Sequence, residues 1–140
     1  MIWPLVAGAA CVWSGCSKEA AEARHKQAAD TFLEKKEFER AELEYLNLLQ
    51  VRPDSTYAMT RMGQIYLEQG RLGRAHPYLV RAKDLAPDNL ENRLRLATVL
   101  LAVGNRNEAF KEADYVFSQS PSNAEAPLLM AEATTTGEAI

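Results

Sequence analysis

The sequence predicts an all-α protein built as a row of stacked helix-turn-helix units. The first indication is that Pro53, Pro87 and Pro121 follow one another at intervals of 34 residues, the length of one helical hairpin. The second is that small and large residues recur at fixed positions within each interval. The third is the composition: 140 residues, 47% hydrophobic and 25% charged, are enough for one modest core. Such a row presents an elongated surface that suits the binding of other proteins.

The first sixteen residues, MIWPLVAGAACVWSGC, differ from the rest because none of them is charged, whereas charged residues are frequent from Lys18 onward. The run is too short to cross a bilayer of about 30 Å as a helix. It matches the apolar region of a secretory signal peptide, followed by small residues. We therefore expect residues 1–16 to be an export signal.

The end of this segment resembles the lipobox of bacterial lipoproteins. The resemblance rests on Val12, Trp13, Ser14, Gly15 and Cys16. It implies removal of the residues before Cys16, lipidation of Cys16, and a membrane anchor of several acyl chains. Because Ser17 is not Asp, it also implies an outer-membrane lipoprotein that faces the periplasm in a Gram-negative cell. The sequence departs from the family at Trp13, where Leu is usual, and in having no Lys or Arg before the apolar run.

Other interpretations of the N-terminus remain open at this point. The signal peptide can end after the small residues 8–10, the acylated residue can be Cys11, or the apolar segment can stay on the protein. Beyond residue 16 the chain has no cysteine, so no disulfide is expected in the domain itself.

The prolines divide the remaining chain into repeats. Segment 17–27 is expected to be a polar helical tether that overlaps the first repeat, although a flexible spacer fits equally well. The repeats run over 22–55, 56–89 and 90–123, followed by 124–140 as a partial fourth repeat or a capping helix. The recurring small and large residues are Ala29, Gly63 and Ala97 at the eighth position, Phe32, Tyr66 and Leu100 at the eleventh, Ala41, Ala75 and Ala109 at the twentieth, and Leu48, Ala82 and Val116 at the twenty-seventh. Small residues let helices approach closely, and large ones fill the adjacent space.

These positions resemble the tetratricopeptide repeat over about 110 residues, from Glu22 into the fourth unit. The resemblance implies an α-solenoid that binds a protein or an extended peptide in a groove lined by the first helix of each repeat. The groove residues that it implies are Lys26, Gln27, Asp30, Tyr57, Arg61, Gln64, Leu94, Arg95 and Thr98, with Leu33, Leu67 and Leu101 as apolar anchors along the same wall.

Turn residues place the helix ends independently of the resemblance. Gly70 and Gly104 are expected to end the first helices of their units, and Lys36 with Glu37 takes this place in the first unit. Pro77 is expected in the first turn of a second helix, where its missing N–H has no partner to lose.

Arg61 and Arg95 occupy equivalent positions one repeat apart. Two guanidinium groups on one wall can bind carboxylates of a peptide, or they can pair with Asp30 or Glu91 of the same chain. In tetratricopeptide domains that clamp the C-terminal carboxylate of a chaperone, Lys and Asn occupy the corresponding positions, so Asp30 and Glu91 here are expected to repel such a ligand.

No catalytic, metal or cofactor site is expected. His25 and His76 lie in different repeats, and no His, Cys or carboxylate cluster has the spacing of a zinc site. With 16 Lys and Arg against 19 Asp and Glu, the net charge of -3 disfavours nucleic acid as a partner, and no small-molecule substrate is evident. The sequence thus favours a non-catalytic scaffold in an envelope assembly, such as outer-membrane protein insertion, pilus assembly or exopolysaccharide export. The alternative is a soluble co-chaperone or adaptor.

Overall fold

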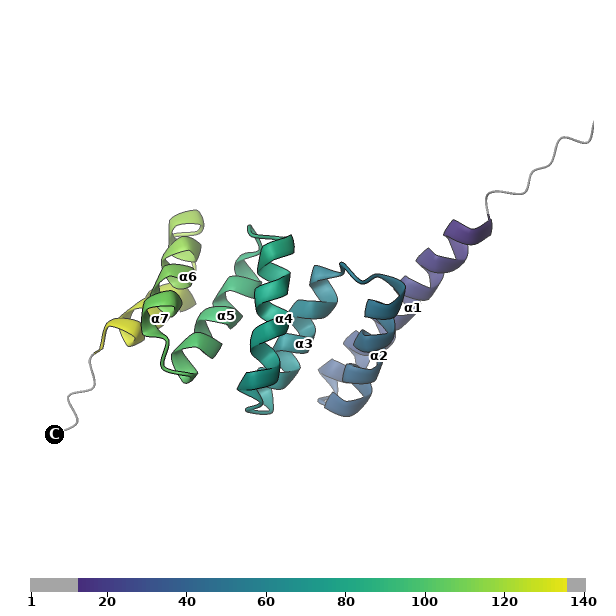
Figure 1. Cartoon of the computed structure of the whole chain (residues 1–140), viewed down its shortest axis with the longest axis horizontal. Coiled ribbons are helices and arrows are strands. Elements are labelled where there is room, and N and C mark those ends of the chain that lie inside the picture. Colours follow the sequence, from purple (N-terminus) through teal and green to yellow (C-terminus); the bar gives the residue numbers. More distant parts are fainter. Residues whose placement is uncertain (1–12, 136–140) are drawn as a thin grey trace, which may run out of the picture.

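The computed structural model describes residues 13–135, with side chains described from residue 17. This range contains seven helices and no strand. They are α1 (Trp13–Glu34), α2 (Phe38–Val51), α3 (Thr56–Glu68), α4 (Leu72–Leu85), α5 (Leu90–Ala102), α6 (Arg106–Gln119) and α7 (Glu125–Thr134). The helices follow one another along the long axis of the molecule, and α2 and α4 lie in front of α1 and α3 (Figure 1). The predicted α-solenoid is confirmed.

The turns between paired helices share one hydrogen-bonded geometry. Lys36, Gly70 and Gly104 have φ angles of 56°, 69° and 82°, in the left-handed region. After each of them the next residue donates its N–H five residues back, as Arg71 does to the carbonyl of Tyr66 at 2.7 Å. This is the Schellman ending of a helix. The first unit therefore forms the same turn as the others, but with a lysine in a conformation that favours glycine.

The segments after the repeating prolines begin new helices with side-chain caps. Ser55 and Asn89 accept hydrogen bonds from the N–H groups of Ala58 and Asn92, at 3.3 and 3.0 Å. Asn123 accepts from Ala126 at 2.8 Å. These bonds satisfy donors that the first turn of a helix leaves unpaired.

The placement predicted for Pro77 is wrong. Helix α4 begins at Leu72, so Pro77 is its sixth residue and lies inside the helix. Because proline has no N–H, the carbonyl of Gly73 cannot receive the usual helical bond from it.

The recurring small residues are where the helices cross most closely. Ala29, Ala41, Ala75 and Ala109 are fully buried. At Gly63 an added Cβ would lie 2.3 Å from Leu79 Cδ2 of the next helix. At Gly63, therefore, the crossing of α3 and α4 has no room for a larger residue.

The N-terminal predictions fall mostly outside the described residues. This holds for residues 1–12, with Cys11 among them, and for the side chain of Cys16. Segment 17–27 lies within α1, which an ion pair of 2.6 Å between Glu22 and Arg52 joins to the end of α2. Of the helices described, none has the length and hydrophobicity of a membrane span.

Helix α7 packs against α5 and α6 through Ala126, Leu129 and Ala133, all of which are buried. Arg106 of α6 donates hydrogen bonds to the carbonyls of Glu132 and Thr135, at 2.7 and 2.8 Å, at the C-terminal end of α7. A cation at this end is also favoured by the helix dipole.

Candidate functional site

Helices α1, α3 and α5 form one long face of the array, which we call the first-helix face. Its clearest hollow is a cavity of about 370 Å³ between α1 and α3. The residues that line it are Asp30, Leu33, Glu34, Lys36, Tyr57, Arg61, Gln64 and Glu68. Four of the nine groove residues predicted from the sequence are thus brought together around one cavity.

Asp30 is the best-connected carboxylate in this cavity. Its Oδ1 accepts hydrogen bonds from the hydroxyls of Tyr45 and Tyr57, both at 2.7 Å, and its Oδ2 accepts from Lys26 at 2.8 Å. Burial alone would raise the pKa of Asp30, but these hydrogen bonds outweigh it and hold the pKa below its ordinary value. The hydrogen bond to Asp30 raises the pKa of Lys26 in return. Asp30 is therefore a fixed anion that holds two tyrosines in place.

Tyr57 lies between the charges of α1 and α3. The ammonium of Lys26 is 4.0 Å from the centre of its ring, and the guanidinium of Arg61 is 5.1 Å from it. Each cation is attracted to the ring, which keeps both side chains close to Tyr57.

Glu91 at the start of α5 joins the two predicted arginines. Its Oε1 accepts from Arg61 at 2.9 Å and from Arg95 at 2.6 Å. Burial would raise the pKa of Glu91, but the two guanidinium groups keep it below the ordinary value. Of the two alternatives for these arginines, the structure shows pairing within the chain.

The cluster of Arg61, Arg95 and Glu91 still contains one positive charge in excess. Arg61 also donates to Gln64 at 2.9 Å. The Nε of Arg95 is buried and has no hydrogen-bond partner among the described residues. A buried donor without an acceptor is unfavourable, so Glu91 does not satisfy all the donors of the two arginines.

The remaining predicted groove residues lie elsewhere. Gln27 is exposed and does not line the cavity. Leu94 is only 8% exposed and packs with Val116 and Leu129 in the core, so it belongs to the interior and not to the binding face. Thr98 donates its hydroxyl to the carbonyl of Leu94 within its own helix, at 3.0 Å.

The prediction of nine residues also omitted residues that the cavity uses. Glu34, Lys36 and Glu68 stand at helix ends, where sequence position gives little guidance to side-chain direction. Leu33, one of the apolar anchors expected in the groove, does line the cavity. The contribution of Tyr45, which reaches Asp30 from α2, required the tertiary structure.

The repeat position that holds Met59 in the second unit is polar in the first and third, where it is His25 and Arg93. The Nδ1 of His25 is hydrogen-bonded to Glu44 at 2.6 Å, and Arg93 forms an ion pair with the buried Glu112. Lys83 binds the same Glu112 at 2.7 Å. Within residues 17–135, no group of three His, Cys, Asp or Glu side chains is arranged to hold a metal ion.

The comparisons with known proteins agree with this architecture. Residues 66–114 match the family model described as tetratricopeptide repeat. A comparison with curated proteins gives no match. Among solved structures, the TPR domain of Arabidopsis OM64 has a TM-score of 0.78 at 16% identity and covers 83% of this chain and 96% of its own.

Two further solved structures are of proteins described as binding peptides. The first TPR of Spaghetti (RPAP3), bound to the HSP90 peptide SRMEEVD, has a TM-score of 0.78 at 17% identity and covers 81% of this chain and 90% of its own. YrrB, described as a TPR protein with an unusual peptide-binding site, has a TM-score of 0.73 at 21% identity. The match covers 82% of this chain and 59% of YrrB. These similarities establish that the chain has the tetratricopeptide-repeat fold.

Proposed function

We propose that this chain is a non-catalytic scaffold that binds an extended segment of a partner polypeptide on its first-helix face. The observation that carries the proposal is the polar cavity between α1 and α3, continued by the cluster of Arg61, Arg95 and Glu91 on α3 and α5. The fold supports it, because a solved structure of the same fold holds a bound peptide.

The proposed ligand contributes a carboxylate to the arginine cluster. Glu91 is half exposed, with 48% of its side chain accessible, and it occupies donors that an incoming carboxylate can use. Exchange of one carboxylate for another keeps the number of charge-assisted hydrogen bonds and leaves the guanidinium groups in place. Bound ligand and Glu91 therefore compete for the same two arginines.

Two sets of variants test this competition. Reversal of both charges, Arg61→Glu with Arg95→Glu, should abolish capture of the partner, whereas Glu91→Gln should strengthen it because the internal competitor is lost. A photo-crosslinking amino acid at the exposed Gln27, introduced in the native host and followed by mass spectrometry, identifies the partner. The same crosslinker at Ser118 on α6 is the control. Capture that both charge reversals leave unchanged would exclude the first-helix face.

We further propose that the chain is a lipoprotein anchored through Cys16 on the periplasmic side of an outer membrane, where it serves an envelope assembly. The support is the uncharged segment 1–16 and its lipobox-like end. Labelling with palmitate should be lost in Cys16→Ser and retained in Cys11→Ser, and globomycin should block maturation. Labelling that is lost in Cys11→Ser instead would assign the lipid to Cys11. No labelling at all would favour the soluble adaptor.

The alternative of a chaperone-binding adaptor has a direct test, since one neighbour of this fold was solved with the peptide SRMEEVD. Two carboxylates, Asp30 and Glu91, stand on the first-helix face of this chain. The proposed ligand brings one carboxylate to the arginine cluster, whereas SRMEEVD carries three acidic side chains, and those outside the cluster would be repelled by Asp30 and the displaced Glu91. We therefore expect this peptide to bind weakly or not at all in a fluorescence anisotropy titration. Tight binding that Arg95→Glu abolishes would establish the adaptor function instead.

A further inference from the structure

An apolar hollow lies between α2 and α4, on the side formed by the second helices. It has a volume of about 640 Å³, within the range of ligand-binding cavities. The residues that line it are Leu46, Leu49, Gln50, Pro53, Met59, Pro77, Tyr78 and Arg81. We call it the α2–α4 groove.

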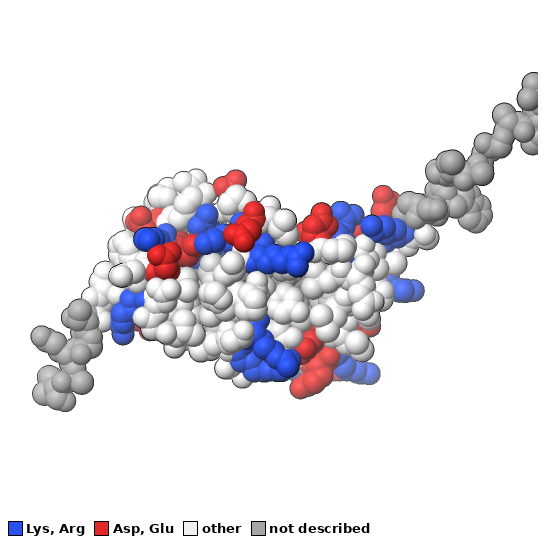
Figure 2. All heavy atoms as spheres, viewed as in Figure 1, with Lys and Arg blue, Asp and Glu red and all other residues white. Residues whose placement is uncertain are grey.

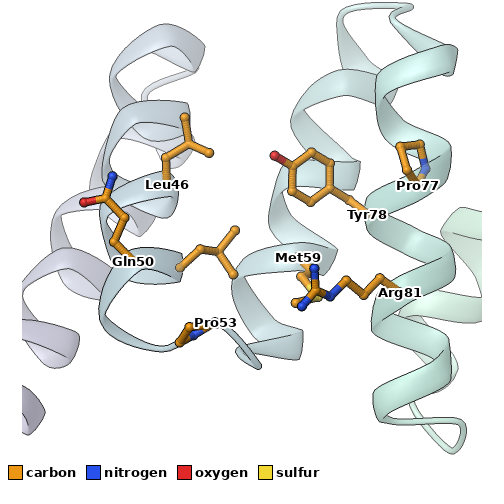
Figure 3. Close-up of a pocket in the computed structure, with 8 residues that line it drawn as sticks. Leu46, Gln50, Pro53, Met59, Pro77, Tyr78 and Arg81 are labelled. Atoms are coloured by element: carbon orange, nitrogen blue, oxygen red, sulfur yellow. The ribbon is translucent and has the colours of Figure 1, made fainter.

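The groove has apolar walls and an apolar floor. Leu46 of α2 and Tyr78 of α4 face each other across it, and Met59 of α3 lies at its base (Figure 3). Leu46 is 36% exposed, so apolar surface is open to solvent at the mouth. On the face that Figure 2 shows, charged side chains gather along the two long edges and the middle is mostly uncharged.

The next pair of second helices offers an internal comparison, because the repeat places equivalent residues 34 positions later. Met59 corresponds to Arg93, Tyr78 to Glu112, and Leu49 to Lys83. Between α4 and α6, Lys83 and Arg93 both bind Glu112, whose side chain is only 6% exposed.

A fourth residue of the α2–α4 groove, Arg81, corresponds to Tyr115 between α4 and α6. The guanidinium of Arg93 stacks 3.7 Å from the centre of the Tyr115 ring, and the Tyr115 hydroxyl donates to Asp88 at 2.8 Å. Between α4 and α6 the chain thus fills its own groove with ion pairs and a stacked ring. Between α2 and α4 the corresponding residues Leu49, Met59 and Tyr78 are apolar and the groove remains open, so it is a particular feature of the first two units and not of the repeat.

Three polar groups at the open groove have no hydrogen-bond or ion-pair partner among residues 17–135. They are the amide of Gln50, the hydroxyl of Tyr78 and the guanidinium of Arg81, and the side chain of Arg81 extends over Met59 (Figure 3). Most other cations in this range are paired with carboxylates of the chain. An amide can serve both the N–H and the C=O of a peptide backbone, and a guanidinium binds a carboxylate.

We infer that the α2–α4 groove is a second peptide-binding site, which takes a segment with apolar side chains and one carboxylate. The apolar side chains lie over Met59 between Leu46 and Tyr78, and the carboxylate pairs with Arg81. Apart from Met59 of α3, the groove is formed by α2, the turn after it and α4, and no residue of the arginine cluster lines it, so the two sites share no residue.

The inference can be tested with the full 140-residue chain and two libraries of short fluorescein-labelled peptides. One library combines leucines with a single glutamate, and the other has lysine in place of the glutamate. Fluorescence anisotropy measures affinity, and amide NMR spectra locate the bound peptide. Glutamate peptides should bind and shift the amides of Leu46, Tyr78 and Arg81.

Arg81→Glu should weaken the glutamate peptides about tenfold, as expected for the loss of one charge-assisted pair, and should favour the lysine peptides. Leu46→Asp, a change at a partly exposed position, should abolish binding of both libraries. Lys111→Glu on α6 changes the net charge equally and should have no effect. Arg61→Glu with Arg95→Glu should also leave this binding intact, which separates it from the first-helix face.

Three results would overturn the inference. One is that no glutamate peptide binds, and the second is that bound peptides shift only amides of α1, α3 and α5. The third is concentration-dependent self-association in analytical ultracentrifugation that Leu46→Asp abolishes, because it would assign the groove to a second copy of the chain.

Discussion

Replacement of Gly63 by alanine tests the packing of α3 against α4 most directly. The added Cβ would lie 2.3 Å from Cδ2 and 2.5 Å from Cγ of Leu79, whereas carbon atoms are in favourable contact at about 3.5–4.0 Å. Leu79 is fully buried and has little freedom to move away. Overpacking costs about 1–3 kcal/mol and, since both atoms are so close, we expect a value near 3. Alanine recovers about 1 kcal/mol of helix propensity. The free energy of unfolding should therefore fall by about 2 kcal/mol.

A double-mutant cycle with Leu79→Ala separates the cost of overpacking against Leu79 from the gain in helix propensity. Leu79→Ala alone should cost about 2–5 kcal/mol because it leaves a cavity. In that background Gly63→Ala no longer meets the leucine and should stabilise the protein by about 1 kcal/mol. Urea unfolding measured by circular dichroism gives all four free energies.

Gly73→Ala is the matched control, because a Cβ at Gly73 would meet no atom within 4 Å. It should stabilise α4 slightly or leave stability unchanged. A Gly63→Ala change that stabilises the wild-type protein, or that has the same effect with and without Leu79, would refute this account of the helix crossing.

Three further predictions concern other parts of the array. Lys36→Gly should raise the free energy of unfolding by up to about 1 kcal/mol, measured by urea unfolding, because glycine adopts the left-handed backbone conformation without the steric cost that lysine has. A loss of stability would contradict the turn geometry. Glu112→Gln should cost about 3 kcal/mol, since it leaves two cations without their shared buried partner, whereas the exposed Glu108→Gln should change little. Asp30 has a native pKa below its ordinary value of 3.8, so its stabilising contribution is present above that pH and is lost as the pH falls through 3.8 toward the native pKa. Asp30→Asn should therefore flatten the loss of stability in acid, measured as the urea midpoint against pH, and an equal slope in Asp30→Asn and in the control Asp84→Asn would contradict this.

Much of the fold was predictable because it depends on local and repeated features. The proline interval, the turn residues and the small residues at helix crossings act within one hairpin or between identical neighbours, so the sequence displays them directly. Pro77 shows the limit of this reasoning. Helix α4 begins at Leu72, earlier than expected, because its N-terminal end is set by the turn at Gly70.

The candidate site was predictable only in outline. The sequence by itself determined that charged side chains of α1, α3 and α5 recur on one face, because helical and repeat periodicity fix the direction of each position. The tertiary structure alone decided that Arg61 and Arg95 share Glu91, that Leu94 is buried, and that the groove at Met59 stays open while its equivalent at Arg93 is filled. The reason is physical: these contacts join side chains distant in the sequence, 30 residues apart for Arg61 and Glu91 and 19 for Arg93 and Glu112. Periodicity gives the direction of a side chain but not its distant partner.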